Sequence, residues 1–294
     1  MERNKESVDS QIVDLHIHTN YSDGFFSPEE IVKLCSQRNV ARFSITDHNS
    51  IGGYLANDEL LKNPHLIPGV ELSAQYRQSP CHILGYFIDV HSSDLLGLLN
   101  KVKKSRMKAN IKLLDALKHE GINIDSDARV LTSRRNIAAV MLREFPGMTI
   151  DLIVKKYLDY EKYGITRPYK PDLEETTQVI RISGGIAVLA HPMQYSRSDV
   201  LAMLNTGFMD GIECYHPKHG LEEICWLKSL AEDRNLCVTG GSDYHSEKNK
   251  CNVGCYIEGK SLFAEMLSLK KKVCHINVSN FFDANQDDSK QNAT

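Results

Sequence analysis

The stretch Asp14–Gly24, DLHIHTNYSDG, ends an apolar run and carries two histidines that are two residues apart. Side chains two apart in a strand lie on the same face, so His16 and His18 can hold one metal ion together. The pair alone is equally compatible with core or surface histidines, and an Asp before Gly, such as Asp23, is most often a turn residue. The rest of the chain therefore decides what the stretch means.

Similar phrases recur along the chain, each beside an apolar run: ITDH, GVE, AHP and GGSDYH close such runs, and CHILGY opens one. Glu71 ends the apolar run LIPGVEL, where an unpaired carboxylate is costly to bury, so a cation partner is expected. With His16, His18 and Asp23, the candidate ligands in these phrases are His48, Glu71, His82, His191, Asp243 and His245. Nine nitrogen and oxygen donors are too many for one ion, and such a set suits Mn²⁺, Fe²⁺ or Zn²⁺.

Strand-length apolar runs alternate with helical patterns on either side of a central break. The first helix has a capping box, with Ser27 and Glu30 three residues apart and Pro28 at the first helical position. The strand, helix, strand order favours a parallel sheet, and its many repeats favour an α/β barrel whose last strand is CHINVS. We expect the barrel over residues 11–93 and 172–279, a helical insertion that caps the substrate over 94–171, and a disordered polar tail over 280–294.

Composition limits the possible partners and compartments. The 294 residues carry a formal net charge of −3, which does not favour tight sequence-independent binding to long nucleic acid. No apolar run approaches the ~20 residues that span a bilayer, and the N-terminus has no signal-peptide pattern, so we expect a cytoplasmic protein. The eight cysteines are then expected to be buried thiols, although Cys251 and Cys255 are closely spaced. No obligate protein partner is evident.

Taken in order, the phrases HxH, SDG, TDH, GVE, HxxGY, AHP and GSDxH resemble the polymerase and histidinol phosphatase (PHP) family of metallohydrolases, from Asp14 to His245. The Asp in SDG and the helical insertion resemble the branch that acts on nucleoside 3′,5′-bisphosphates and short RNA 5′ ends. The resemblance implies a distorted seven-stranded (β/α) barrel and two to three divalent ions, commonly manganese.

The same resemblance assigns the nine ligands to three ions. His16, His18, Glu71 and Asp243 would hold one ion, and Glu71 would bridge to a second ion that also takes His82 and His191. Asp23, His48 and His245 would hold the third ion. Asp47 would then lie behind the ligands and orient one of them.

The predicted reaction is hydrolysis of a phosphate ester. Two ions ~4 Å apart can share a nucleophilic hydroxide while a third neutralises phosphoryl oxygens, which favours a phosphate dianion over a neutral amide. Arg134 in TSRRNIA resembles a substrate-phosphate ligand and His219 in YHPKHG resembles a histidine near the site, with Arg135 and Lys218 as further candidates. The alternative for these cations is a solvated helix face.

One position departs from the related branch, which has a histidine where this chain has Asn136. His216 is a candidate substitute, and no general acid is assigned.

Three functions follow from these residues. The first is a phosphatase for a small nucleotide, above all a nucleoside 3′,5′-bisphosphate, with short RNA 5′ ends as further substrates. The second keeps the same metal centre in a cyclic phosphodiesterase or a small-molecule phosphatase of the histidinol-phosphate type. The third is a non-catalytic PHP binding module, against which the complete ligand set argues.

Overall fold

The computed structural model describes residues 11–77, 79–124, 133–247, 251–254, 256–258 and 266–270. The chain divides into two compact units, one of residues 1–95 and 172–294 and the other of residues 96–171. The expected strand at CHINVS and the expected tail over 280–294 lie outside the described residues.

The first unit alternates strands and helices. In chain order its elements are β1 (Gln11–Ile17), α1 (Pro28–Gln37), β2 (Val40–Ile45), α2 (Gly52–Ala56), η1 (Asp58–Lys62), β3 (Gly69–Tyr76), β4 (Ser79–Tyr86), α6 (Leu173–Ile182), β5 (Ile186–Leu189), η4 (Pro192–Gln194), α7 (Arg197–Leu204), β6 (Gly211–Tyr215), α8 (Leu221–Arg234), β7 (Cys237–Gly240) and β8 (Tyr256–Glu258). The predicted capping box is present at the start of α1, where Ser27 and Glu30 each bond the other's backbone N–H.

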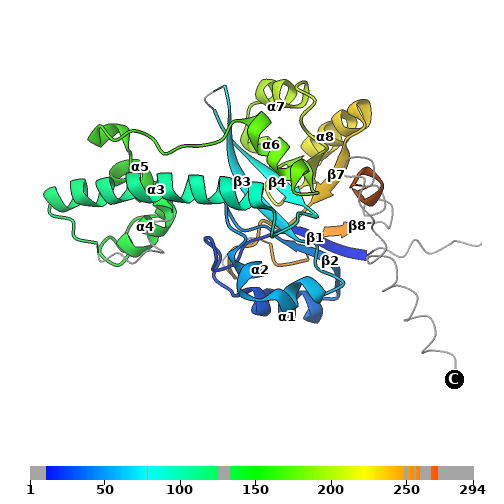
Figure 1. Ribbon diagram of the computed structural model, residues 1–294, viewed down its shortest axis with the longest axis horizontal. Helices are drawn as coiled ribbons and strands as arrows, with labels where there is room; N and C mark the ends of the chain where they lie inside the picture. Colours follow the sequence, from blue (N-terminus) through cyan, green and yellow to red (C-terminus); the bar gives the residue numbers. More distant parts are fainter. Residues whose placement is uncertain are drawn as a thin grey trace, which may run out of the picture. The chain divides into compact units, whose positions relative to one another are not determined.

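The strands form a three-stranded sheet in the order β2-β1-β8 and a five-stranded sheet in the order β3-β4-β5-β6-β7. Helix α1 packs on β2, α6 covers β3 to β5, and α8 covers β6 and β7 (Figure 1). Strands β1 and β2 are parallel, as are β5, β6 and β7. The predicted α/β class is therefore confirmed.

The predicted parallel order is wrong at β3, β4 and β5, which are antiparallel neighbours. Strand β3 ends at Tyr76 and β4 begins at Ser79, a connection far too short for the crossover that a parallel pair requires.

The closed seven-stranded barrel is not confirmed. At both junctions between the sheets, the described residues form isolated bridges rather than ladders: Ile17 pairs with Tyr244 at one junction, and Phe43 with Leu66 and His48 with Glu71 at the other. Strand β1 ends at Ile17 and β2 ends at Ile45, so neither strand extends the pairing beyond these bridges.

Buried side chains from both sheets, including Leu15, Leu84, Tyr86 and Val188, form the core of the first unit. Cys35, Cys81, Cys214 and Cys237 are buried thiols, whereas Cys225 is exposed. The prediction of thiols throughout is wrong at Cys251, which is disulfide-bonded. Among the described residues, no helix has the length and apolar character needed to cross a bilayer.

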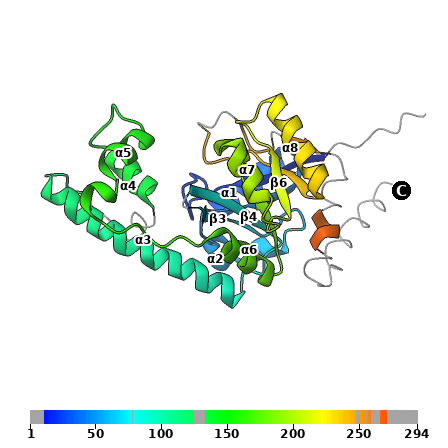
Figure 2. The same cartoon turned by 90° about the horizontal axis from the view of Figure 1, so that it is seen from above.

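The second unit is helical and has its own core. It contains most of α3 (Ser93–His119), followed by α4 (Arg134–Met141), α5 (Ile150–Tyr157) and η3 (Glu161–Tyr163), and Figure 2 shows α3 as one long continuous helix. Its core includes Leu113, Leu117, Ile137, Ile153 and Leu158.

Candidate metal centre

A single buried carboxylate, Glu71 on β3, lies among five of the predicted histidines. Its Oε2 atom is 2.8 Å from His48 Nδ1 and 3.3 Å from the Nε2 atoms of both His16 and His18. Its Oε1 atom is 2.9 Å from both His82 Nδ1 and His191 Nε2. The two oxygens of Glu71 thus face two different sets of ring nitrogens, which is the arrangement of a bridging carboxylate.

Two aspartates extend this cluster. Asp243 Oδ1 lies 3.3 Å from His18 Nε2 and 3.6 Å from His16 Nε2. Asp23 Oδ1 lies 3.2 Å from His245 Nε2 and 3.9 Å from His18 Nδ1, and its Oδ2 lies 3.9 Å from His48 Nε2. The side chains of all nine predicted ligands therefore lie close together in the first unit.

Three groups of ligand atoms are each compact enough to surround one ion. They are His18, Asp23, His48 and His245; His16, His18 and Glu71; and His48, Glu71 and His82. The first corresponds to the set that the family resemblance implied for a third ion, with His18 added.

The orientation of the buried atoms fits metal ligands better than hydrogen-bonding groups. His16 Nε2, both ring nitrogens of His18, His48 Nδ1 and Glu71 Oε2 are buried and form no hydrogen bond among the described residues, although opposing atoms lie about 3 Å away. Unsatisfied buried polar atoms are rare and call for an explanation such as a bound ion. These residues belong to groups whose ligand atoms all lie within 4.8 Å of one another, as ligands of a common cation do.

The histidines of the site differ in their pKa values. Burial, assisted by His245 and His48, lowers the pKa of His18 to about 3, and burial lowers the pKa of His82 to about 4. These rings are neutral at pH 7, which is the form that binds metals. Burial also acts to lower the pKa of His48, but the carboxylates of Glu71 and Asp23 outweigh it and raise that pKa to about 9.

Glycines allow the turns that carry the two aspartates to approach β1 closely. A Cβ atom on Gly24 would collide with the His18 carbonyl oxygen, and one on Gly241 would collide with the Cβ of His16. Backbone hydrogen bonds hold both turns in place: His18 N–H donates to the Tyr244 carbonyl, and Phe25 N–H donates to the His245 carbonyl.

Two predicted ligands have left-handed backbone conformations. The φ angle is 29° at His191 and 50° at Asp243, a region that non-glycine residues seldom adopt. Such strain costs of order 1–3 kcal/mol and persists where surrounding structure imposes it, commonly at functional sites. Here it places both side chains toward the cluster.

Sequence reasoning missed Glu213, on β6. Its side chain is fully buried, and its Oε1 accepts a hydrogen bond from His16 Nδ1 at 2.9 Å while its Oε2 accepts one from the His191 backbone N–H at 2.6 Å. Glu213 therefore orients one ligand ring and fixes the strained backbone of another. The signal was present in the sequence, because a carboxylate inside the apolar run GIECY needs a partner as much as Glu71 does.

Asp14, in the middle of β1, was also missed as a site residue. It is buried and accepts hydrogen bonds from the Ser242 and Gly254 backbone N–H groups at 2.9 and 2.8 Å, which ties the turn before Asp243 to β1. Burial raises the pKa of Asp14 to about 6, although these N–H groups act to lower it.

Asp47 accepts hydrogen bonds from the Thr19 backbone N–H at 2.7 Å, the Thr19 hydroxyl and the Ser22 hydroxyl. It therefore anchors the turn that leads to Asp23.

Near Asp243, buried His216 has its Nε2 3.3 Å from the Oδ2 atom, and the exposed Lys218 ammonium is 3.8 Å from the same oxygen. His219 contacts the His216 ring and places its Nδ1 2.9 Å from the Cys214 carbonyl. Burial lowers the pKa of His219.

The predicted arginines lie in the second unit. Arg134 is the first residue of α4, donates to the Leu158 carbonyl at 2.9 Å and stacks over the Tyr160 ring. Arg135 pairs with Asp151 at 2.8 Å on the surface. Asn136 donates its backbone N–H to the capping hydroxyl of Ser133.

An α/β unit with this cluster defines the chain as a candidate polynuclear metalloprotein. Its sequence matches the PHP domain over residues 14–216, so the chain belongs to the PHP domain family, as its resemblance predicted.

Three curated relatives cover about 80% of this chain. The phosphoribosyl 1,2-cyclic phosphate 1,2-diphosphodiesterase of Eggerthella lenta is 30% identical, with 95% of its length covered. The 5′-3′ exoribonuclease Rnm of Salmonella typhimurium is 29% identical, with 85% covered. The 3′,5′-nucleoside bisphosphate phosphatase of Chromobacterium violaceum is 28% identical, with 87% covered.

A solved structure shares the fold. The crystal structure described as a putative metal-dependent phosphoesterase from Bifidobacterium adolescentis has a TM-score of 0.76 at 21% identity, covering 92% of this chain and 98% of the other.

Proposed function

We propose that this chain is a metal-dependent phosphatase that removes a phosphate from a nucleoside 3′,5′-bisphosphate. The observation that carries the proposal is the convergence of nine histidine and carboxylate side chains around Glu71. All three relatives are named for the hydrolysis of phosphate esters, which supports that reaction class for this chain. The phosphatase from Chromobacterium violaceum supports the particular substrate.

We assign the nine residues as ligands of two to three divalent ions, manganese being our choice for the native metal. The donors are imidazoles and carboxylates only, a set compatible with Mn²⁺, Fe²⁺ and Zn²⁺. The chemistry that such ions supply is activation of water and neutralisation of phosphoryl charge. The chain's own residues position the ions: Glu71 faces two sets of nitrogens, and Glu213 orients His16.

Arg134 and His219 are our candidates for holding the substrate. Among the described residues no carboxylate pairs with Arg134, so its guanidinium retains donors for a phosphate. Arg135 is the weaker candidate because Asp151 already pairs with it. His219 lies beside His216, which contacts Asp243.

A cyclic phosphodiesterase is the second candidate function, because the relative from Eggerthella lenta has that name and is 30% identical over 80% of the chain. Short RNA with a 5′ end is a third substrate, supported by the exoribonuclease from Salmonella typhimurium.

Hydrolysis of adenosine 3′,5′-bisphosphate, a cyclic ribose phosphate and a short RNA by manganese-loaded protein tests these candidates. Free phosphate is measured for the bisphosphate, and chromatography measures the product monoester from the cyclic ester and the mononucleotides from the RNA. We expect the bisphosphate to have the largest kcat/KM, and His191→Ala to abolish turnover. A larger kcat/KM for the cyclic ester would replace the first proposal with the second. Fewer than about two bound metal equivalents and no hydrolysis of any of the three substrates would favour a non-catalytic binding module.

A further inference from the structure

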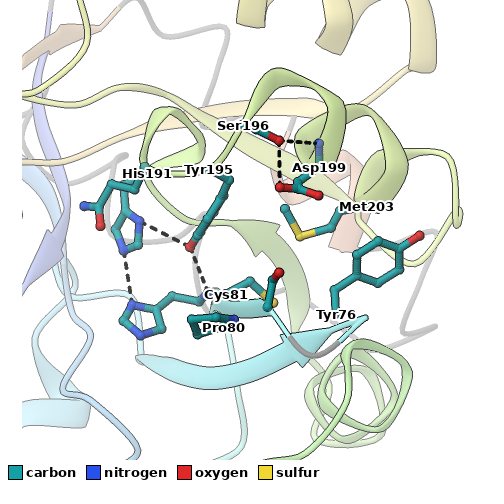
Figure 3. A pocket seen from close by; sticks show the side chains of 11 residues that line it. Tyr76, Pro80, Cys81, His191, Tyr195, Ser196, Asp199 and Met203 are labelled. Carbon is teal, nitrogen blue, oxygen red and sulfur yellow. Dashed lines mark hydrogen bonds between the residues drawn. The ribbon is translucent and has the colours of Figure 1, made fainter.

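A pocket of about 390 Å³ opens directly beside the metal centre (Figure 3). This volume falls within the roughly 300–1,000 Å³ typical of small-molecule sites. Two of its lining residues, His82 and His191, are candidate metal ligands that contact Glu71 Oε1 at 2.9 Å. A molecule in the pocket would therefore be continuous with a phosphate held at the centre.

The pocket lies between the β3–β4 hairpin and the segment formed by η4 and α7. Tyr76, Ser79 and Pro80 line it from the hairpin, and Tyr195 and Met203 line it from the other side. In Figure 3 His191 lies at one end of the lining, and Tyr76 and Met203 lie toward the other. The Tyr76 hydroxyl donates to the Ala202 carbonyl at 3.3 Å, which connects the hairpin to α7.

Two contacts of the Tyr195 hydroxyl hold together the end of the pocket nearest the candidate ligands. The Tyr195 hydroxyl oxygen accepts a hydrogen bond from the His82 backbone N–H at 3.0 Å and lies 3.4 Å from His191 Nδ1. One phenol therefore holds the segments that carry both histidines. Its ring forms part of the pocket wall next to the ligands.

The side chains that line the pocket indicate which kind of ligand it can bind. Among the described residues, no lysine or arginine lines the pocket and Asp199 is the one carboxylate that does, so this lining does not suit a second phosphate. Two tyrosine rings, a methionine thioether and a proline favour a flat apolar ring. Asp199 Oδ2 accepts from the Ser196 hydroxyl at 2.6 Å, whereas Oδ1 has no hydrogen-bond partner among the described residues and can accept from an amino group.

We propose that this pocket receives the nucleobase of the substrate while the phosphate lies at the metal centre. The inference rests on the proposed phosphatase function and adds the part of the substrate that the metals do not recognise. A nucleobase combines the flat face and the ring or amino N–H groups that this lining matches, and a sugar phosphate without a base would leave the pocket unused.

The test compares two ligands that share a ribose 5-phosphate and differ only in the base. Adenosine 5′-monophosphate and ribose 5-phosphate are titrated calorimetrically into the manganese-loaded protein. We expect the nucleotide to bind about tenfold more tightly or better, the scale of one base stacked on an aromatic side chain.

Two substitutions at exposed positions fill the pocket from opposite walls, Ser79→Trp and Gln194→Trp. Each should weaken nucleotide binding by about tenfold and leave ribose 5-phosphate within about twofold. Ser36→Trp, at an exposed position of α1, is the matched control and should change neither affinity. Circular dichroism and bound manganese verify that each variant is folded and loaded.

The outcomes separate the two proposals. If the two ligands bind the unchanged protein equally, or the pocket variants weaken neither or both alike, the nucleobase pocket is refuted. Phosphate release by the unchanged protein would still support the phosphatase. If neither ligand binds and no phosphate is released, the proposed function fails, and the pocket proposal fails with it.

Discussion

The two compact units of the chain differ in the titratable groups that they bury. In the first unit, Glu71, His16 and His18 are completely buried beside one another. In the second, the core is aliphatic and aromatic, and ion pairs such as Arg135 with Asp151 lie in solvent at 55% and 82% exposure. Because burying unpaired charge is costly, the first unit is arranged for a cation, whereas the second is stabilised by its own packing.

Glu71→Gln is expected to have the largest effect, because it removes the charge and one acceptor of the carboxylate that faces both sets of ring nitrogens. We expect kcat/KM for phosphate release to fall by at least about a thousandfold, because metal charge contributes several kcal/mol to such reactions. Bound manganese, measured by elemental analysis, should fall as well. Glu59→Gln, at a surface carboxylate paired with Lys62, should change neither quantity. Normal metal content in Glu71→Gln would refute the bridging role.

A core substitution tests the second unit independently of the metal. Leu117→Ala removes a fully buried side chain from the helical core and should destabilise that unit by about 2–5 kcal/mol. Hydrogen exchange resolved by segment should show faster exchange in α3 to α5 and an unchanged manganese-binding affinity. Ile111→Ala, at a 47% exposed position of α3, is the control and should have little effect. If Leu117→Ala lost manganese binding as well as the stability of α3 to α5, the two units would not be independent.

Glu213→Gln tests whether Glu213 orients the candidate ligands of the first unit. The amide keeps the shape but can accept only through one atom, so either His16 or the His191 backbone loses its partner. We expect manganese affinity to fall by about 10–100-fold, as for other residues that orient metal ligands. Titration calorimetry measures it, with exposed Glu222→Gln as the control. An unchanged affinity would reduce Glu213 to a structural role.

Arg134→Ala is expected to have the smallest effect and to act on the substrate alone. Loss of one guanidinium contact should raise KM for a nucleoside bisphosphate by about tenfold and leave bound manganese unchanged. Arg143→Ala, an exposed arginine beyond the end of α4, should leave KM unaltered. If both variants have the KM of the unchanged protein, Arg134 has a structural role within the second unit only.

The ligand phrases were readable from the sequence because short-range geometry places them. His16 and His18 share a face of one strand, and Glu71 lies in an apolar run that requires a partner. The pairing of the strands was harder to predict. Strands β3 and β4 form an antiparallel hairpin because their connection is short, whereas the repeated strand–helix pattern elsewhere favoured parallel strands. Glu213 and Asp14 were missed because their partners, His191 and Ser242 among them, are far away in the sequence.

Local periodicity and the fixed order of the phrases were enough to predict the α/β class, the family and the residue types that can hold divalent metals. The folded chain was needed to see which atoms meet: the two sets of nitrogens at Glu71, the left-handed backbones of His191 and Asp243, and the pocket beyond His82. Those features arise from strands and turns that are distant along the chain. Their contacts are set by packing and close approach, as at Gly24 and Gly241, which no local pattern encodes.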